Sequence, residues 1–356
     1  SKNVLYSDFF SVVLEGEADG LPLPGGYLLL ADDEKTLSKR MEKDPYFVRA
    51  YAKNQMYTGK HIATKLWVGD YTTGDTFEKF AQKAEGIKRI GVLRADVDNL
   101  GQTFVTGFAG KYATLSRTAA LSRQLSIFFK YYIRSILKNG EYHVDGEKKL
   151  TERNATIVYS GGDDVFIVGA WNEVIELSID LQEKFKKYTQ ETLSISAGIG
   201  IYECTYPIAA IANETGEMEA ESKRMPEKDS VTLMDDGETH LINELEICDG
   251  TYRWEELYRN VLGEKYDVIQ DFLGESDERG MSFLYRMLEL IRNQKEKINF
   301  ARFVYLLSRL EPDKEGEKKE KYRKFSRKMY QWVQSEKDCR ELKTAINLYA
   351  YMHREK

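Results

Sequence analysis

The sequence of 356 residues has few of the side chains that build metal–sulfur sites or disulfide-rich folds. Its three cysteines, Cys204, Cys248 and Cys339, are too far apart for a CxxC-type zinc cluster. An odd number in a chain of this length also argues against a secreted disulfide scaffold. The four histidines, at positions 61, 143, 240 and 353, are equally scattered. A zinc site is therefore not expected, and any metal ion should be held by carboxylates.

Long apolar runs and an excess of basic residues are missing as well. No stretch approaches the roughly 20 apolar residues that a membrane-spanning helix needs, and no signal peptide is visible at the start. The formal net charge is -6, with both signs interspersed along the chain. We therefore expect a cytoplasmic protein without membrane contact. Chain-wide attraction to nucleic acid is not expected, although the composition allows a local basic face.

What the sequence does contain divides into three regions. Residues 1–88 alternate short extended pieces with turn-rich segments such as LPLPGG, which predicts a small, loop-rich β region. Residues 89–250 carry longer strand and helix patterns. Residues 251–356 carry amphipathic helical segments separated by charged breaks. We therefore expect an α+β chain with an all-α C-terminal domain.

The middle region has the element order of a ferredoxin-like split sheet. The apolar run RIGVLRADVDN predicts a buried strand, and apolar residues from Leu121 to Leu137, Tyr132 among them, recur at helical spacing. Two strand-like runs then flank Gly161 and Gly162, because adjacent glycines suit the positive φ angles of a tight hairpin. A helix, the strand TLSISAGIGIY, a broken helix PIAAIANETGEMEAESKR and the strand DSVTLMD follow. Polymerase palms and nucleotide cyclases share this architecture, which alone does not establish a function.

Two pairs of carboxylates are candidate metal ligands. Asp96 and Asp98 end the first palm strand, and Asp163 and Asp164 follow the glycine pair. We expect this strand and the hairpin to be adjacent, which brings the four acids together. Two like charges about 4 Å apart cost roughly 1 kcal/mol in water and about 4 kcal/mol at an effective dielectric constant near 20. Bound Mg²⁺ or Mn²⁺ would offset this cost and could hold a nucleoside triphosphate for in-line displacement.

The alternative is that Gly-Gly-Asp-Asp is simply a favourable turn sequence, since glycine and aspartate are common turn residues. The second acid pair, at the end of a strand in the right place in the element order, favours the metal site.

Two further segments are candidate phosphate-binding elements. The turn at Gly101 can expose consecutive backbone amides to an anion, with an ordinary connecting loop as the alternative. Lys223, Arg224 and Lys228 precede the last palm strand, where they could reach a triphosphate or form a solvated helix end. The basic residues between positions 318 and 328 favour a solvated helix face, with RNA or partner contact as the alternative.

Several of these segments together resemble a known family, the large subunit of type III CRISPR effector complexes, in particular the Csm (III-A) type. The resemblance is carried by GVLRADVDNLGQTF, YSGGDDVFIVGAW, TLSISAGIGIY and YPIAAIA. It extends upstream through YTGKHIATKLWVGDY and downstream into EKINFARFVYLLSRLEP. Family members also contain an HD nuclease domain, a first palm and a zinc region. This sequence has no HD dipeptide and no zinc-type cysteine spacing, so it resembles only the second palm and helical part, as a fragment or one half of a split subunit.

The resemblance implies that the chain makes cyclic oligoadenylates from ATP when the guide RNA pairs with foreign RNA. It implies that Asp96, Asp163 and Asp164 hold two Mg²⁺ or Mn²⁺ ions and act in catalysis, with Asp98 supporting the ions or facing the nucleotide. The segment MPEKDSV, which contains Lys228, lacks the glycine that this segment usually has in the related GGDEF cyclases, so the likeness to those enzymes is weaker at Lys228. The residues expected to line the ATP site are Val97, Asn99, Leu100, Gly101, Ser160, Gly161, Gly162, Lys223 and Lys228.

Partners follow from the same resemblance. They are the missing first palm and HD half, a small subunit on the helical domain, the subunit that binds the guide-RNA 5′ end, and the guide and target RNAs. The acceptor ATP of the family looks to be held between two palms, so this chain should bind one ATP with metal yet make little product alone. Two alternatives stay open. One is a GTP-using GGDEF-type cyclase; Val165 and Phe166 follow the second aspartate in place of the GGDEF sequence and argue against it. The other is a scaffold with vestigial acids, and the retention of all four acids argues against that alternative.

Overall fold

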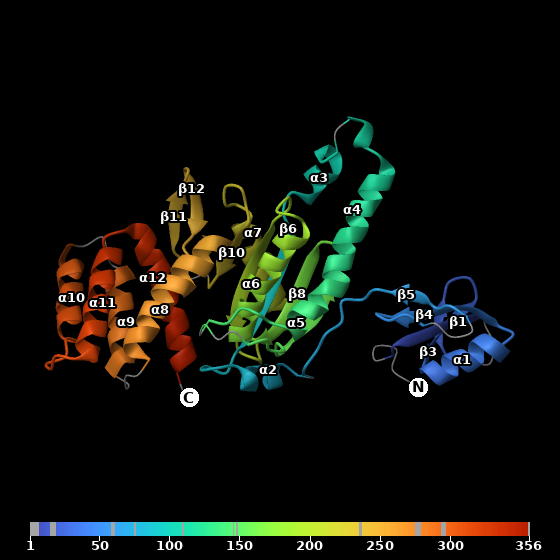
Figure 1. Ribbon diagram of the computed structural model, residues 1–356, viewed down its shortest axis with the longest axis horizontal. Helices are drawn as coiled ribbons and strands as arrows, with labels where there is room; N and C mark the ends of the chain where they lie inside the picture. The colour runs from blue at the N-terminus through green and yellow to red at the C-terminus, as the bar shows by residue number, and fades with distance from the viewer. Residues whose placement is uncertain are drawn as a thin grey trace.

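The computed structural model describes residues 7–14, 19–57, 61–74, 76–108, 110–144, 146, 149–234, 237–274, 279–292 and 297–354. Three parts follow one another along the long axis of the molecule: an N-terminal sheet, a central palm and a C-terminal group of helices (Figure 1). The expected α+β class, with a palm followed by helices, is confirmed.

In the N-terminal part, the short extended pieces pair into a five-stranded sheet in the order β2-β3-β1-β4-β5. The helix α1 (Glu34–Lys43) packs on this sheet through the buried Leu37, and the Asp33 side chain caps it by accepting from the Thr36 amide at 2.8 Å. The strands are β1 (Phe9–Leu14), β2 (Leu21–Leu23), β3 (Tyr27–Asp32), β4 (Phe47–Lys53) and β5 (Thr64–Leu66).

The palm is built on a six-stranded sheet in the order β13-β10-β9-β6-β8-β7. The central strand β6 pairs antiparallel with both β8 and β9, and β10 lies parallel to β9. The strand and helix order expected for residues 89–233 is confirmed. The strands are β6 (Ile90–Val97), β7 (Ala155–Ser160), β8 (Asp164–Ala170), β9 (Ile195–Tyr202), β10 (Ser230–Leu233) and β13 (Thr251–Arg253).

Helices cover both faces of this sheet, which is why β6 is almost continuously apolar. Leu93 and Ala95 belong to the large core on the side of α6 (Trp171–Tyr188). Val92 belongs to a smaller core on the other face, with α2 (Phe77–Lys83) and α7 (Ile208–Ser222). Asp96 has the same parity along β6 as Val92, so it lies on the α7 face. The expected break in α7 is wrong, because the helix runs without interruption.

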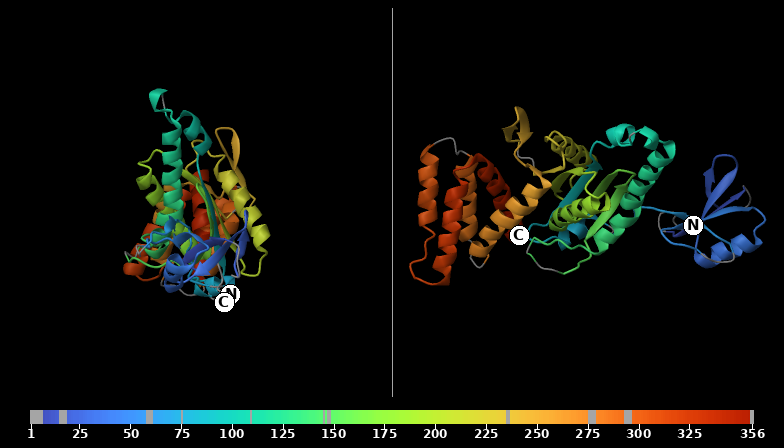
Figure 2. Two further views of the ribbon diagram at one scale, coloured as in Figure 1. Left: turned by 90° about the vertical axis from the view of Figure 1, so that its right-hand side faces the viewer. Right: turned by 45° about the horizontal axis from the view of Figure 1, so that its top comes forward.

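A helical segment connects β6 to β7, and α3 and the first half of α4 in this segment project beyond the palm sheet (Figures 1 and 2). Leu125, Phe128 and Ile133 are buried as the apolar spacing predicts. Tyr132, expected on the same stripe, is 44% exposed, because a π-helical turn shifts the phase of the helix there. The parts are α3 (Leu100–Thr106), η2 (Gly110–Tyr112), α4 (Leu115–Ile127), the π turn η3 (Phe128–Tyr132) and α5 (Ile133–Lys138).

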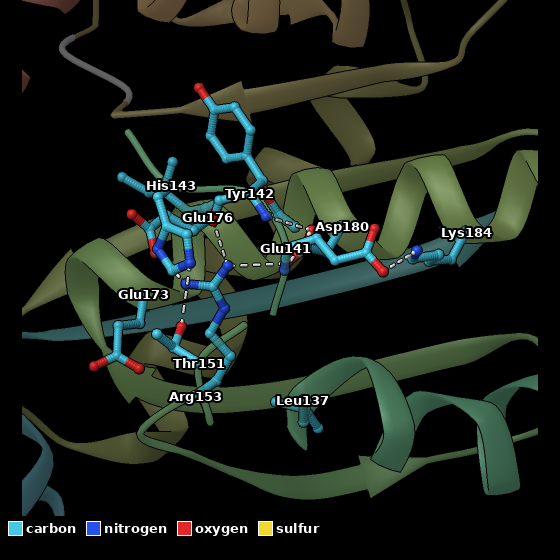
Figure 3. A network of polar contacts seen from close by, with 12 residues as sticks. Leu137, Glu141, Tyr142, His143, Thr151, Arg153, Glu173, Glu176, Asp180 and Lys184 are labelled. Atoms are coloured by element: carbon cyan, nitrogen blue, oxygen red, sulfur yellow. Dashed lines mark hydrogen bonds and ion pairs between the residues drawn. The ribbon is translucent and has the colours of Figure 1, made fainter. Parts of the chain in front are cut away.

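A buried charge network fastens the chain between α5 and β7 to α6 (Figure 3). Arg153 is 1% exposed; its guanidinium contacts the Glu176 carboxylate and lies 2.9 Å from Asp180. The His143 ring lies 3.4 Å from the same Glu176 carboxylate. Burial raises the pKa of Glu176, and the Arg153 charge opposes this shift. Each buried charge in this network therefore has a partner of opposite sign, as burial demands.

In the residues that the structure describes, the C-terminal part adds a hairpin and six consecutive helical segments. Tyr252 and Trp254 belong to one continuous core that the palm shares with these helices, and the Ile87 amide donates to the Tyr351 carbonyl at 2.9 Å. The sequence pattern predicted the last four helices and missed the other elements. No helix in the described ranges is long and apolar enough to cross a membrane. The elements are β11 (Thr239–Ile242), β12 (Leu245–Cys248), η4 (Glu256–Tyr266), α8 (Asp267–Leu273), α9 (Arg279–Arg292), α10 (Lys297–Ser308), α11 (Glu317–Trp332) and α12 (Glu336–His353).

Candidate functional site

The two acid pairs meet at one end of the palm sheet. β6 and β8 run antiparallel with Asp96 directly opposite Asp164, and the Val97 amide donates to the Asp163 carbonyl at 3.1 Å. Strand pairing thus fixes the β6 acids beside the hairpin, because register allows no slip without moving buried side chains to the other face. β8 lies next to β6 as expected, whereas β7 lies at the edge of the sheet.

The turn between β7 and β8 is closed by a hydrogen bond from the Gly161 amide to the Asp164 carbonyl at 2.8 Å. Neither Gly161 nor Gly162 adopts a positive φ, so the conformational reason expected for this glycine pair is wrong. The reason at Gly161 is steric. A Cβ there would lie 2.3 Å from Oδ1 of Asp164 and 2.5 Å from the Tyr159 hydroxyl oxygen. Glycine therefore leaves room for these two polar groups.

Burial and the charges at this edge shift the pKa values of Asp163 and Tyr159. Burial raises the pKa of Asp163, the Asp96 and Asp164 carboxylates raise it further, and Lys223 opposes the shift. The charge of Asp164 likewise raises the pKa of Tyr159, with smaller contributions from burial and from their hydrogen bond. The Tyr159 hydroxyl thus stays protonated and donates to Asp164. Sequence reasoning missed Tyr159; its position in the strand that leads into the turn was the only available signal.

Lys223 at the end of α7 supplies the positive charge. Its Nζ contacts the Asp96 carboxylate and lies 2.7 Å from the Glu219 carboxylate. Glu219 also pairs with Nε of Arg94 at 2.8 Å. Burial tends to lower the pKa of Lys223, but the hydrogen bonds to Asp96 and Glu219 outweigh it and raise the pKa. Sequence reasoning missed Glu219, although its place one helical turn before Lys223 on α7 is typical of an ion pair.

Asp98 plays a different part from Asp96, because its side chain is 2% exposed. Its Oδ2 accepts from the Ser194 hydroxyl at 2.8 Å and from the Asp229 amide at 3.1 Å. Its Oδ1 is buried without a hydrogen-bond partner among the described residues. Asp98 thus ties the end of β6 to the chain before β9 and β10.

The loop after Asp98 brings a second lysine to the site. Asn99 adopts a left-handed conformation with φ 53°, and its Oδ1 accepts from Lys228 Nζ at 2.7 Å. Leu100 and Gly101 lie in the first turn of α3, where Gly101 is exposed, and Val97 is buried.

Two of the sequence candidates point elsewhere. The Ser160 hydroxyl donates to the Phe129 carbonyl, in the π-helical turn of the long helix. Arg224 pairs with Glu221 and donates to the Glu246 carbonyl on β12. The structure therefore brings Lys223 to Asp96 and Lys228 to Asn99, and leaves the Ser160 and Arg224 side chains engaged with other parts of the fold.

The donor set fits a divalent cation that substrate oxygens help to bind. Within the residues that the structure describes, no three Asp, Glu, His or Cys side chains are arranged to hold an ion by themselves. Mg²⁺ commonly takes only one or two carboxylates and completes its shell with water and substrate phosphates. Asp96 and Asp164 lie opposite each other at this edge. Burial and, after it, the Asp96 and Asp164 carboxylates raise the pKa of Asp163, and a bound cation would relieve the repulsion from those carboxylates. The unpartnered Oδ1 of Asp98 is a further oxygen at this edge.

Comparison with protein families identifies two regions. Residues 89–232 match the second palm domain of Cas10/Cmr2, and residues 270–355 match the second helical domain of Cmr2, a subunit of the CRISPR RNA silencing complex. The first match contains Asp96, Asp98, Asp163, Asp164, Glu219, Lys223 and Lys228.

Two curated relatives carry the name CRISPR system single-strand-specific deoxyribonuclease Cas10/Csm1 (subtype III-A). The protein from Mycobacterium tuberculosis is 41% identical over 350 residues, which are 97% of this chain and 41% of the relative. The protein from Enterococcus italicus is 37% identical over 355 residues, which are 98% of this chain and 42% of the relative. The chain thus spans less than half the length of these relatives.

Solved structures share the fold at lower identity. A Csm1–Csm4 subcomplex of the type III-A interference complex aligns with a TM-score of 0.73 at 22% identity, over 98% of this chain and 48% of the other. Csm1–Csm4 cassettes in complex with cA4 and with AMPPNP align with TM-scores of 0.71 and 0.68 at 21% and 23% identity, over 98% and 96% of this chain and 49% and 48% of those chains. These alignments show the shared fold, and the two domain matches and the curated relatives show that the chain belongs to the Cas10/Csm1 family of type III-A CRISPR large subunits, of which it contains the second palm and the helical domain.

Proposed function

We propose that this chain is the nucleotidyltransferase palm of a type III-A large subunit. It binds ATP with Mg²⁺ or Mn²⁺ and, within the complete complex, makes cyclic oligoadenylates when target RNA is sensed. The observation that carries the proposal is the register of β6 and β8, which sets Asp96 opposite Asp164 and beside Asp163, with Lys223 in contact. Solved neighbours bound to AMPPNP and cA4 support a nucleotide ligand for this fold.

In this reaction the 3′-hydroxyl of one nucleotide attacks the α-phosphorus of an ATP, a 3′–5′ phosphodiester forms and pyrophosphate leaves. Two bound divalent ions would activate the hydroxyl and neutralise charge on the phosphates. Asp96, Asp163 and Asp164 would hold these ions. Lys223 and Lys228 would meet the phosphates, Lys223 by exchanging the Asp96 carboxylate for a phosphate oxygen.

The site needs partners to work. Because the chain spans less than half of its curated relatives, we propose that a first palm completes the acceptor site and that product forms poorly without it. Csm4 is the proposed neighbouring subunit, since the aligned structures are Csm1–Csm4 complexes. A small subunit on the helical domain, the guide and target RNAs and a cytoplasmic location complete the proposal. The sequence has no HD dipeptide, so we do not assign it deoxyribonuclease activity.

Calorimetric titration of ATP, then GTP, into the chain with and without Mn²⁺ tests the proposal. The variant Asp163→Ala with Asp164→Ala should lose metal-dependent ATP binding. A matched variant, Glu317→Ala with Glu320→Ala, removes two exposed carboxylates from α11 and should bind like the parent.

Three other outcomes would count against the proposal. Unchanged ATP binding in the palm variant would show that the site is assigned wrongly. Tighter binding of GTP than of ATP would favour a GGDEF-type cyclase. The absence of nucleotide binding both in the chain and in its complex with partner subunits would leave a scaffold.

A further inference from the structure

One continuous segment of this acidic protein contains no acid at all. Between Asp98 and Glu141 there is no aspartate or glutamate, whereas the same stretch holds six lysines and arginines. The whole chain carries 58 acids against 52 lysines and arginines, so the segment departs from its surroundings. We call residues 99–140 the acid-free segment; it comprises α3, η2, α4, η3 and α5.

Five of the six basic side chains of this segment have no acidic partner among the residues that the structure describes. Arg134 pairs with Asp70 at 3.5 Å. Among the residues that the structure describes, the other five have no ion pair: Lys111, Arg117, Arg123, Lys130 and Lys138. The basic residues of α11 provide a contrast, since Lys321, Arg323 and Lys324 pair with Glu317, Glu315 and Asp271 respectively. The charge of α11 is therefore compensated locally, whereas that of the acid-free segment is not.

The acid-free segment is also presented to the outside. α3 and the first half of α4 project beyond the palm sheet, where the views show no other element covering them (Figures 1 and 2). From Lys111 to Arg117 every side chain is exposed, including Leu115 at 86%. A helix exposed on nearly all sides gains little from burial within its own chain. Its conformation is therefore suited to a contact outside the chain.

Aromatic rings are interleaved with these charges. Tyr112 is 46% exposed, and the Arg117 guanidinium lies 4.4 Å from its ring centroid. In the π turn, Tyr131 and Tyr132 are each 44% exposed, and Tyr131 packs edge-on against Trp67 at 4.4 Å between centroids. Positive charges alone would suffice to bind an acidic protein surface. The bases of a single-stranded nucleic acid also stack on exposed aromatic rings, so the rings favour a nucleic-acid ligand.

We propose that the acid-free segment is a binding surface for a single-stranded polynucleotide. Its free cations contact phosphates, and its exposed tyrosines stack with bases. The α-helical rise of 1.5 Å per residue spreads the cations from Arg117 to Lys138 over about 30 Å, long enough to follow several nucleotides. The inference goes beyond the proposed nucleotide chemistry and does not need it, because it uses none of the palm carboxylates.

Fluorescence anisotropy with labelled mixed-sequence 20-mers of RNA and of DNA, over a series of salt concentrations, tests this inference on the full chain. The segment variant carries Lys111→Gln, Arg117→Gln and Arg123→Gln. The control variant carries Lys321→Gln, Arg323→Gln and Lys324→Gln on α11, so that both lose three positive charges. A third variant, Tyr112→Leu, keeps the charges and removes one stacking ring.

The segment variant should bind the polynucleotide at least about tenfold more weakly at low salt. The slope of log affinity against log salt should become shallower by about 2, because three phosphate contacts are lost and each contributes about 0.7 for single strands. The α11 control should stay within about twofold of the parent. Tyr112→Leu should weaken binding about fivefold or more with an unchanged salt slope. A preference for the RNA or the DNA probe identifies which polynucleotide is the natural one.

Equal losses in the segment and α11 variants would overturn the inference, since they would reflect net charge alone. So would undiminished binding by the segment variant, or a poly-glutamate peptide that competes as well as RNA, which would indicate an acidic protein partner. Titration of ATP into the segment variant separates this inference from the proposed function. Weakened polynucleotide binding with ATP binding equal to that of the parent supports the surface, whether or not the parent binds ATP.

Discussion

Replacing Lys223 with methionine removes the ammonium that contacts Asp96 and keeps the length of the side chain. The Lys223 and Asp96 side chains are 25% and 26% exposed. Their ion pair therefore lies between surface pairs, worth about 0–1 kcal/mol, and buried pairs, whose disruption costs about 3–5 kcal/mol. We expect the free energy of unfolding to fall by about 1 kcal/mol in the absence of metal. Glu219 keeps its pairing with Arg94 at 2.8 Å, so the rest of the palm should remain folded.

The same substitution should strengthen metal binding, because the ammonium and a divalent cation compete for Asp96. An interaction of about 1 kcal/mol corresponds to about a fivefold change in affinity, so Mn²⁺ should bind about fivefold more tightly to Lys223→Met than to the parent. ATP at saturating Mn²⁺ should bind more weakly, because a phosphate contact is lost. A single change would thus move the affinities for metal and for nucleotide in opposite directions.

Calorimetric Mn²⁺ titrations and thermal unfolding with and without Mn²⁺ measure both effects. Lys228→Met is the matched control: it removes an equal charge nearby, but Lys228 contacts the neutral Asn99 amide oxygen rather than a carboxylate. Its Mn²⁺ affinity should stay within about twofold of the parent. The reasoning is refuted if Lys223→Met binds Mn²⁺ no more tightly than the parent, or if both variants tighten it equally.

Two further predictions concern stability. Burial tends to raise the pKa of Asp249, but hydrogen bonds from His240 and Lys343 outweigh it and lower the pKa from 3.8 to about 2. The ionised Asp249 carboxylate therefore stabilises the fold above about pH 4, and this stabilisation is lost as the pH falls toward 2. In urea unfolding, Asp249→Asn should lower the free energy of unfolding by about 1 kcal/mol at pH 7 and by almost nothing near pH 2. A cost that does not change with pH would contradict this account. Arg153→Met leaves the Glu176 and Asp180 carboxylates buried without the guanidinium that pairs with them. The free energy of unfolding should therefore fall by about 3–5 kcal/mol. A loss below about 1 kcal/mol would show that the carboxylates move into solvent instead.

Much of the palm could be predicted because its signals are local. The continuous apolar run in RIGVLRADVDN and the glycines between two strand-like runs suffice to place β6, β7 and β8. The proximity of Asp96 to the hairpin acids follows from the antiparallel pairing of these elements. The last four helices were predictable for the same reason, since apolar spacing marks α9 to α12, whereas η4 and α8 were missed.

The π-helical turn and the role of Gly161 were not predictable. Apolar spacing assumes an unbroken α-helix, so it placed Tyr132 on the buried stripe, and only the inserted π turn exposes that ring. Two adjacent glycines indicate positive φ by frequency, yet at Gly161 the reason is the space occupied by Asp164 and Tyr159. Both errors arise where the environment of a residue outweighs its average preference.

The sequence by itself determined the order of strands and helices in the palm and the presence of two acid pairs at the end of β6 and at the hairpin, because apolar runs and turn composition act over a few residues. Only the tertiary structure decided what each acid does. Asp98 is buried against Ser194 and the Asp229 amide, whereas Asp96 meets Lys223, a residue 127 positions away. Such contacts depend on how α7 lies across the sheet, and the free energy of that packing comes from the whole core rather than from any local pattern.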